Sequence, residues 1–63
     1  MPEISMRVIE LINRSGPVSI AGAEEALRVN KYTLRSHFRG LVQEGYLIQL
    51  GRARATKYAL ASP

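Results

Sequence analysis

Most arginine and lysine residues lie in the second half of this chain, where their spacing suits the binding of an anion. The 63 residues carry nine Lys and Arg against five Glu, which gives a formal net charge of +4. Residues 1–27 are acidic by two, with four Glu and two Arg, whereas residues 28–57 are basic by six, with seven Lys and Arg and one Glu. Such asymmetry indicates a surface built for a polyanion. The alternative is a solvated basic face that only keeps the chain soluble.

A helix expected over residues 31–44 separates these charges from an apolar side. Asn30 is a good N-cap, and Gly45 ends the segment. At about 100° per residue, one arc of this helix gathers apolar side chains, namely Leu34, Phe38, Leu41 and Val42. Another arc gathers basic and hydrogen-bonding side chains, namely Tyr32, Arg35, Ser36, Arg39 and Gln43. The first arc suits a core and the second suits a polar partner.

The polar arc has the chemistry that nucleic acid requires. Arg35 and Arg39 lie about one turn apart and can bind phosphate oxygens or pair bidentately with guanine. Lys31 lies at the helix N-terminus, where N–H groups and the helix dipole favour a phosphate. Ser36 and Gln43 can both donate and accept hydrogen bonds. Tyr32 can offer its hydroxyl to a phosphate or its ring to a thymine methyl group.

Two further helices are expected before this one. Residues 2–15 place an apolar stripe on one face, with Pro2 at the first helical position and Gly16 and Pro17 as the stop. Residues 18–20 are a short extended piece, and Ser19 can cap a short helix over residues 20–28.

A hairpin is expected after the third helix. Residues 46–50 and 56–60 are β-prone, and a five-residue loop with Gly51, Arg52 and Arg54 joins them. Lys57 lies on the outward face of the second strand.

Other residues offer little chemistry. The chain has no cysteine, which excludes disulfides and Cys-based zinc sites. The single histidine, His37, borders the apolar arc and is best interpreted as a half-buried structural residue. Tyr46 and Tyr58 are interpreted as core or core-edge aromatics. No apolar run approaches the roughly 20 residues of a transmembrane helix, and no catalytic, metal or cofactor site is indicated.

The order of these elements resembles the winged helix-turn-helix family, and within it the small bacterial, plasmid and phage regulators. Residues 18–20, 26–35, 41–47 and 51–58 carry the resemblance, which spans residues 4–60. It implies one α+β domain over residues 1–63, with three helices and a C-terminal two-stranded wing. Two positions depart from the family pattern. Arg28 stands where the family often has glycine, and Gly22 stands where an acidic residue could complete a capping box.

The resemblance implies a transcription regulator that binds double-stranded DNA. Residues 31–43 become a recognition helix in the major groove, and the basic loop 51–55 meets the backbone or minor groove. The expected DNA-binding residues are Lys31, Tyr32, Arg35, Ser36, Arg39, Gln43, Arg52, Arg54 and Lys57. We expect no enzymatic activity, cofactor, metal or small-molecule effector domain, and a cytoplasmic, nucleoid-associated location.

Two alternatives to a regulator that binds double-stranded DNA stay open at this point. The chain could be a protein-interaction module, because fold alone does not fix function. Its target could be RNA or left-handed DNA, although the related group that binds left-handed DNA typically has prolines in its wing and this loop has none. The regulator itself is expected to bind two DNA half-sites as a homodimer through its first helix, where Met6 and Ile9 fall outside the main apolar stripe.

Overall fold

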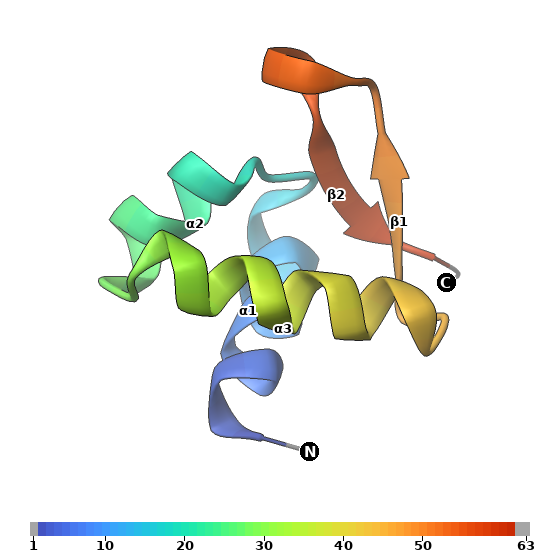
Figure 1. Ribbon diagram of the computed structural model, residues 1–63. Coiled ribbons are helices and arrows are strands. Elements are labelled where there is room, and N and C mark those ends of the chain that lie inside the picture. The colour runs from blue at the N-terminus through green and yellow to red at the C-terminus, as the bar shows by residue number, and fades with distance from the viewer. Residues whose placement is uncertain (1, 62–63) are drawn as a thin grey trace.

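The computed structural model describes residues 2–61, which form three helices followed by a β-hairpin (Figure 1). The helices are α1 (Glu3–Ser15), α2 (Ile20–Leu27) and α3 (Lys31–Gln43). The hairpin consists of β1 (Leu47–Leu50) and β2 (Lys57–Leu60), with a short 3-10 turn, η1 (Ala53–Ala55), between them. This is the α+β arrangement expected from the sequence. No helix in residues 2–61 is long and apolar enough to cross a bilayer.

The first helix begins one residue later than expected. Pro2 has an extended ψ of 147° and is the N-cap, rather than the first helical residue. Its carbonyl still accepts a hydrogen bond from the Met6 amide at 3.1 Å, so it closes the first turn from outside. At the other end Gly16 has φ +85°, a conformation that glycine adopts without the penalty of a Cβ. The predicted stop is therefore confirmed.

Each of α2 and α3 begins with a side-chain cap, and a strained residue follows α2 in the turn that joins the two helices. Ser19 Oγ accepts from the Gly22 amide at 3.0 Å, and Asn30 Oδ1 accepts from the Tyr32 amide at 2.7 Å. Arg28 follows α2 with φ 58° and ψ 39°, in the left-handed region. The chain thus keeps the conformation that favours glycine and accepts the strain of a side chain there.

The hairpin is tied to the rest of the fold by its second strand. β1 and β2 are antiparallel, with Leu47 opposite Leu60 and Gln49 opposite Tyr58. On the far side of β2, Val18 and Tyr58 exchange backbone hydrogen bonds of 3.0 and 2.7 Å. Of the piece expected to be extended, Val18 alone forms this bridge, because Ser19 is the N-cap of α2 and Ile20 is its first residue; the bridge fixes β2 against the helices.

The core lies where the three helices meet the inner face of the hairpin. Its buried apolar residues are Val8, Leu11, Ile12, Ala23, Leu27, Leu34, Phe38, Leu41 and Leu47. Val42, expected in the same arc, is half-buried. His37 is half-buried as expected, and its Nδ1 lies 3.0 Å from Oγ of the buried Ser5. The expectation for Tyr46 is wrong, because this side chain is 48% exposed. It precedes β1 on the strand face that points away from the helices.

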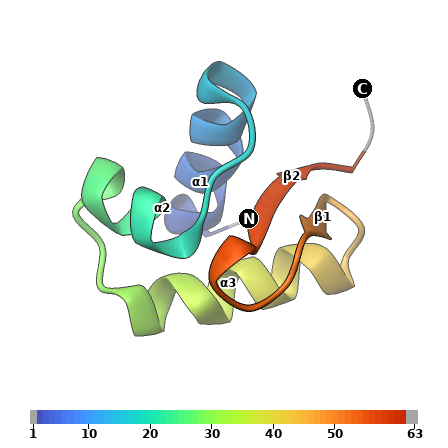
Figure 2. The same ribbon diagram turned by 90° about the horizontal axis from the view of Figure 1, so that it is seen from above.

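Seen from above, α1 and α3 lie on opposite sides of the molecule (Figure 2). The hairpin and α2 flank them at either end. The exposed side of α3 and the tip of the hairpin consequently share one side of the fold, and the outward face of α1 lies on the other.

Candidate nucleic-acid interface

The polar arc of α3 is exposed along its whole length. Every residue expected there is solvent-exposed, namely Tyr32, Arg35, Ser36, Arg39 and Gln43, and so is Lys31 at the start of the helix. The opposite arc holds Leu34 and Phe38, which are fully buried. Because this apolar arc packs into the core, it fixes the direction in which Arg35 and Arg39 project.

Two cations flank an exposed aromatic ring at the start of α3. Lys31 Nζ lies 5.5 Å and Arg35 Cζ lies 5.8 Å from the centroid of the Tyr32 ring. Cation–π attraction at exposed sites is worth about 0.5–1 kcal/mol, enough to bias these flexible side chains. Tyr32 is 66% exposed, so this group of two cations and one ring lies at the surface.

The backbone amides at this end of α3 already have partners. The Lys31 amide donates to Glu24 Oε2 at 3.2 Å, and the Tyr32 amide donates to Asn30. The phosphate expected at these N–H groups therefore meets occupied donors. The side chain of Lys31 is what this end of the helix offers to an anion.

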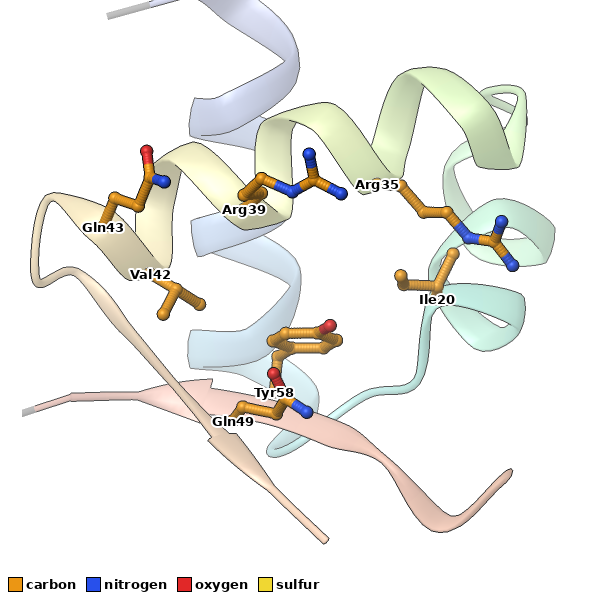
Figure 3. Close-up of a pocket in the computed structure, with 7 residues that line it drawn as sticks. All are labelled: Ile20, Arg35, Arg39, Val42, Gln43, Gln49 and Tyr58. Atoms are coloured by element: carbon orange, nitrogen blue, oxygen red, sulfur yellow. The ribbon is translucent and has the colours of Figure 1, made fainter. Parts of the chain in front are cut away.

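A hollow lies between α3, the start of α2 and the hairpin (Figure 3). One lobe, of about 320 Å³, is lined by Ile20, Arg35, Arg39, Val42, Gln43, Gln49 and Tyr58. The second lobe, of about 310 Å³, extends toward the loop and shares four of these residues, namely Ile20, Arg35, Gln49 and Tyr58. It adds Arg54 and Thr56 from the hairpin loop side.

The hollow combines a basic rim with an apolar floor. Arg35, Arg39 and Arg54 supply three guanidinium groups, and no carboxylate is among the residues that line either lobe. Such groups bind phosphate oxygens in a planar, bidentate way. Ile20 and Tyr58 supply apolar surface against which a sugar or base edge can pack.

The basic residues of the hairpin differ in their position relative to the hollow. Arg54 lines the hollow and lies within the 3-10 turn, whereas Arg52 precedes that turn and is exposed beside it. Lys57 is exposed, and it begins β2 opposite Leu50. The structure thus brings Arg35, Arg39 and Arg54 together but leaves Arg52 and Lys57 outside the hollow.

Gln49 and Tyr58 line this hollow although sequence reasoning gave neither a binding role. They face each other across the hairpin, and each lines both lobes. The period-2 alternation from Leu47 could have placed Gln49 on the inner face. Its exposure beside α3 depends on how the hairpin docks, which the alternation does not specify.

Metal chemistry has no support among the described residues. Within residues 2–61, no three His, Cys, Asp or Glu side chains cluster closely enough to hold a metal ion.

Comparisons with known proteins agree on the fold. No protein-family model and no curated protein sequence matches the chain. By structure it is similar to the apo-Zalpha domain of zebrafish PKZ, with a TM-score of 0.89 and 20% identity, over 95% of this chain and 94% of that chain. It is also similar to the DIP2311 protein from Corynebacterium diphtheriae, with a TM-score of 0.82 and 21% identity, over 92% of this chain. There the match spans 10% of the longer chain.

Proposed function

The chain has the winged helix-turn-helix fold, and from this premise we propose that it binds double-stranded DNA and acts as a transcription regulator. In this proposal α3 is the recognition helix and enters the major groove. The loop that contains Arg52 and Arg54 lies against the backbone or in the minor groove. The chain acts by binding and catalyses no reaction.

The observation that carries the proposal is the carboxylate-free hollow between α3 and the hairpin. Three arginines from two separate elements converge on it, and the exposed polar arc of α3 continues the same surface. Phosphate contacts of this kind supply most of the affinity for DNA and position the protein, while base contacts supply sequence preference. Arg35, Arg39, Ser36 and Gln43 are the candidates for base contacts.

Fluorescence anisotropy tests the proposal directly. The protein is titrated into a labelled random-sequence duplex of roughly 20 base pairs, about two helical turns, at several salt concentrations. We expect binding that weakens with salt, with a log–log slope near −0.9 for each phosphate neutralised. Absence of binding by the folded protein at low salt would falsify the proposal.

Two double variants measure the contributions of α3 and of the hairpin loop to DNA binding separately. Arg35→Ala/Arg39→Ala and Arg52→Ala/Arg54→Ala should each weaken binding about tenfold or more, because a hydrogen bond to a charged group is worth about 1.5–3 kcal/mol. Both should also give a shallower salt slope. Arg35→Lys/Arg39→Lys keeps the charge, so it reports whether the planar guanidinium matters.

A matched control tests whether net charge alone explains any loss. Ser15→Glu lowers the net charge by one, as a single Arg35→Ala does, but at the exposed end of α1. We expect Ser15→Glu to keep its affinity within about twofold, since an exposed charge far from the DNA is screened beyond about 10 Å. Equal losses in Ser15→Glu and Arg35→Ala would mean that no localised interface exists.

Two competitor nucleic acids distinguish the remaining targets. A double-stranded RNA of the same length tests RNA, and an alternating dC–dG duplex monitored by circular dichroism tests left-handed DNA. We expect neither to compete better than ordinary duplex DNA. If instead the folded protein binds no nucleic acid, its basic face is a partner surface, and the chain is an interaction module.

A further inference from the structure

The outward face of α1 carries an apolar strip that the rest of residues 2–61 leaves partly exposed. Met6 is 57% exposed, and Ile9 is half-buried beside it. These two side chains line a shallow hollow together with Glu10, Asn13 and Leu60. Because Val8, Leu11 and Ile12 form the buried stripe of the same helix, Met6 projects almost directly away from the core.

A stripe of alternating charges runs along α1 beside this apolar strip. Its members are Glu3, Arg7, Glu10 and Arg14, all exposed. At about 100° per residue they fall within roughly 60° of arc, next to Met6. Their spacings are 4, 3 and 4 residues, and the order of signs is acid, base, acid, base. Read in reverse, the spacing is the same and every sign is inverted.

This pattern makes the stripe complementary to itself in one orientation only. When two helices pack antiparallel about a two-fold axis, the same flank of each helix meets its own copy in reverse order. A two-fold axis at the level between Val8 and Ile9 sets Glu3 level with the second copy's Arg14, and Arg7 level with the second copy's Glu10. A parallel arrangement about a two-fold axis would set the two stripes on opposite flanks of the contact, so these charge pairs would not form.

We propose that the outward face of α1 binds a second copy of this chain, with the two α1 helices antiparallel. The alternating charges select the partner and the orientation, while the strip of Met6 and Ile9 supplies the apolar contact. Met6 of one copy falls level with the turn between Ile9 and Asn13 of the other, next to the hollow that Leu60 closes. Methionine suits this role because its flexible side chain fills irregular gaps.

Contacts within the chain leave these charges available. Arg7 Nη2 donates to the Leu27 carbonyl at 3.0 Å, which holds the guanidinium in place but uses one of its five N–H groups. Arg14 Nη1 lies 3.9 Å from Glu10 Oε1, and the two side chains are 65% and 78% exposed. An exposed pair of this kind is worth about 0–1 kcal/mol, so it exchanges readily for a pair between copies.

The dimer leaves the proposed DNA-binding side open. α1 and α3 lie on opposite sides of the molecule (Figure 2), so both copies keep α3 and the hairpin loop exposed. The contact surface is small, since one face of a 13-residue helix buries less than the ~800 Å² per partner of a stable complex. Self-association is therefore weak and reversible, and it does not depend on the DNA-binding proposal.

Charge-swap variants test the proposal by sedimentation equilibrium at high protein concentration and low salt. Glu3→Arg/Glu10→Arg makes the stripe wholly basic, and Arg7→Glu/Arg14→Glu makes it wholly acidic. Each variant alone should lose at least tenfold in self-association relative to the unchanged chain. An equimolar mixture should form a heterodimer at least as strong as the original homodimer, because every pair is then complementary.

Single-site variants control for a loss of self-association that is caused by misfolding, since Arg7→Glu also removes the hydrogen bond to the Leu27 carbonyl. Glu3→Arg and Arg14→Glu touch only exposed side chains and should reproduce the same recovery on mixing, to a smaller extent. Met6→Asn should weaken the dimer without any change of charge, and circular dichroism confirms that each variant is folded. A chain that stays monomeric at millimolar concentration, or variants that show no recovery when mixed, would overturn the proposal.

Discussion

Phe38 of α3 and Tyr58 of β2 meet edge to face, with ring centroids 4.7 Å apart and planes inclined by 78°. Phe38 is fully buried, whereas Tyr58 is half-buried and lines both lobes of the hollow. This pair joins the helix that carries Arg35 and Arg39 to the hairpin that carries Arg54. This aromatic contact in the core, together with the bridge between Val18 and Tyr58, therefore positions the two basic elements relative to each other.

Tyr58→Phe should distinguish the role of the Tyr58 ring in packing from the role of its hydroxyl in DNA binding. The ring contact with Phe38 is retained, so the free energy of unfolding should change by less than about 0.5 kcal/mol. DNA affinity should fall about two- to tenfold, since a hydrogen bond is worth about 0.5–1.5 kcal/mol. Urea denaturation and anisotropy titration measure the two quantities. A large loss of stability with unchanged affinity would show that the Tyr58 hydroxyl serves the fold and not the interface.

Arg28→Gly should stabilise the protein by about 0.5–1 kcal/mol, because glycine adopts a positive φ without a Cβ penalty. Arg28 has φ 58° and is exposed, so the substitution removes strain and little else. Thermal or urea denaturation measures the gain. Arg28→Ala is the matched control, since it removes the same charge but keeps the Cβ, and it should bring no comparable gain.

Gly51→Ala should destabilise the hairpin by about 1–3 kcal/mol. Gly51 has φ +77°, and a Cβ there would lie 2.6 Å from the Ala55 carbonyl oxygen, so the loop must move. Affinity for DNA should fall as well, because Arg52 and Arg54 move with the loop. Gly40→Ala is the control, since a Cβ there meets nothing within 4 Å and alanine favours the helix. Gly40→Ala should raise stability and leave the loop intact.

Local sequence patterns predicted the helices closely, because helix caps and helical periodicity depend on residues within about one turn of each other. Asn30 and Ser19 were expected as caps, and both side chains accept the expected amide hydrogen bonds. The 3.6-residue period of residues 31–44 gave α3 to within one residue at its C-terminus. Pro2 differs from the expectation by one position, because its ring fixes φ near the helical value but leaves ψ free, and ψ is extended at 147°.

The shape of the candidate site could not be predicted from the sequence, because it depends on how the hairpin packs against α3. Arg35 and Arg39 were expected as a pair from their spacing along one helix. Their meeting with Arg54 and Gln49 requires the angle of the hairpin, which depends on the bridge between Val18 and Tyr58. Exposure of Tyr46 has the same cause, since strand alternation does not say which face the helices cover.

Ser5 and His37 join α1 to α3 across 32 positions of sequence. Ser5 is 5% exposed, and its Oγ lies 3.0 Å from His37 Nδ1. Ser5→Ala leaves a half-buried ring nitrogen without this partner, which should cost about 1–3 kcal/mol in urea denaturation. Replacing both groups, in Ser5→Ala/His37→Leu, should cost less than the sum of the two single changes, because no polar atom is then left unpaired. Strict additivity would mean that the two side chains contribute independently, and that α1 and α3 are joined by apolar packing alone.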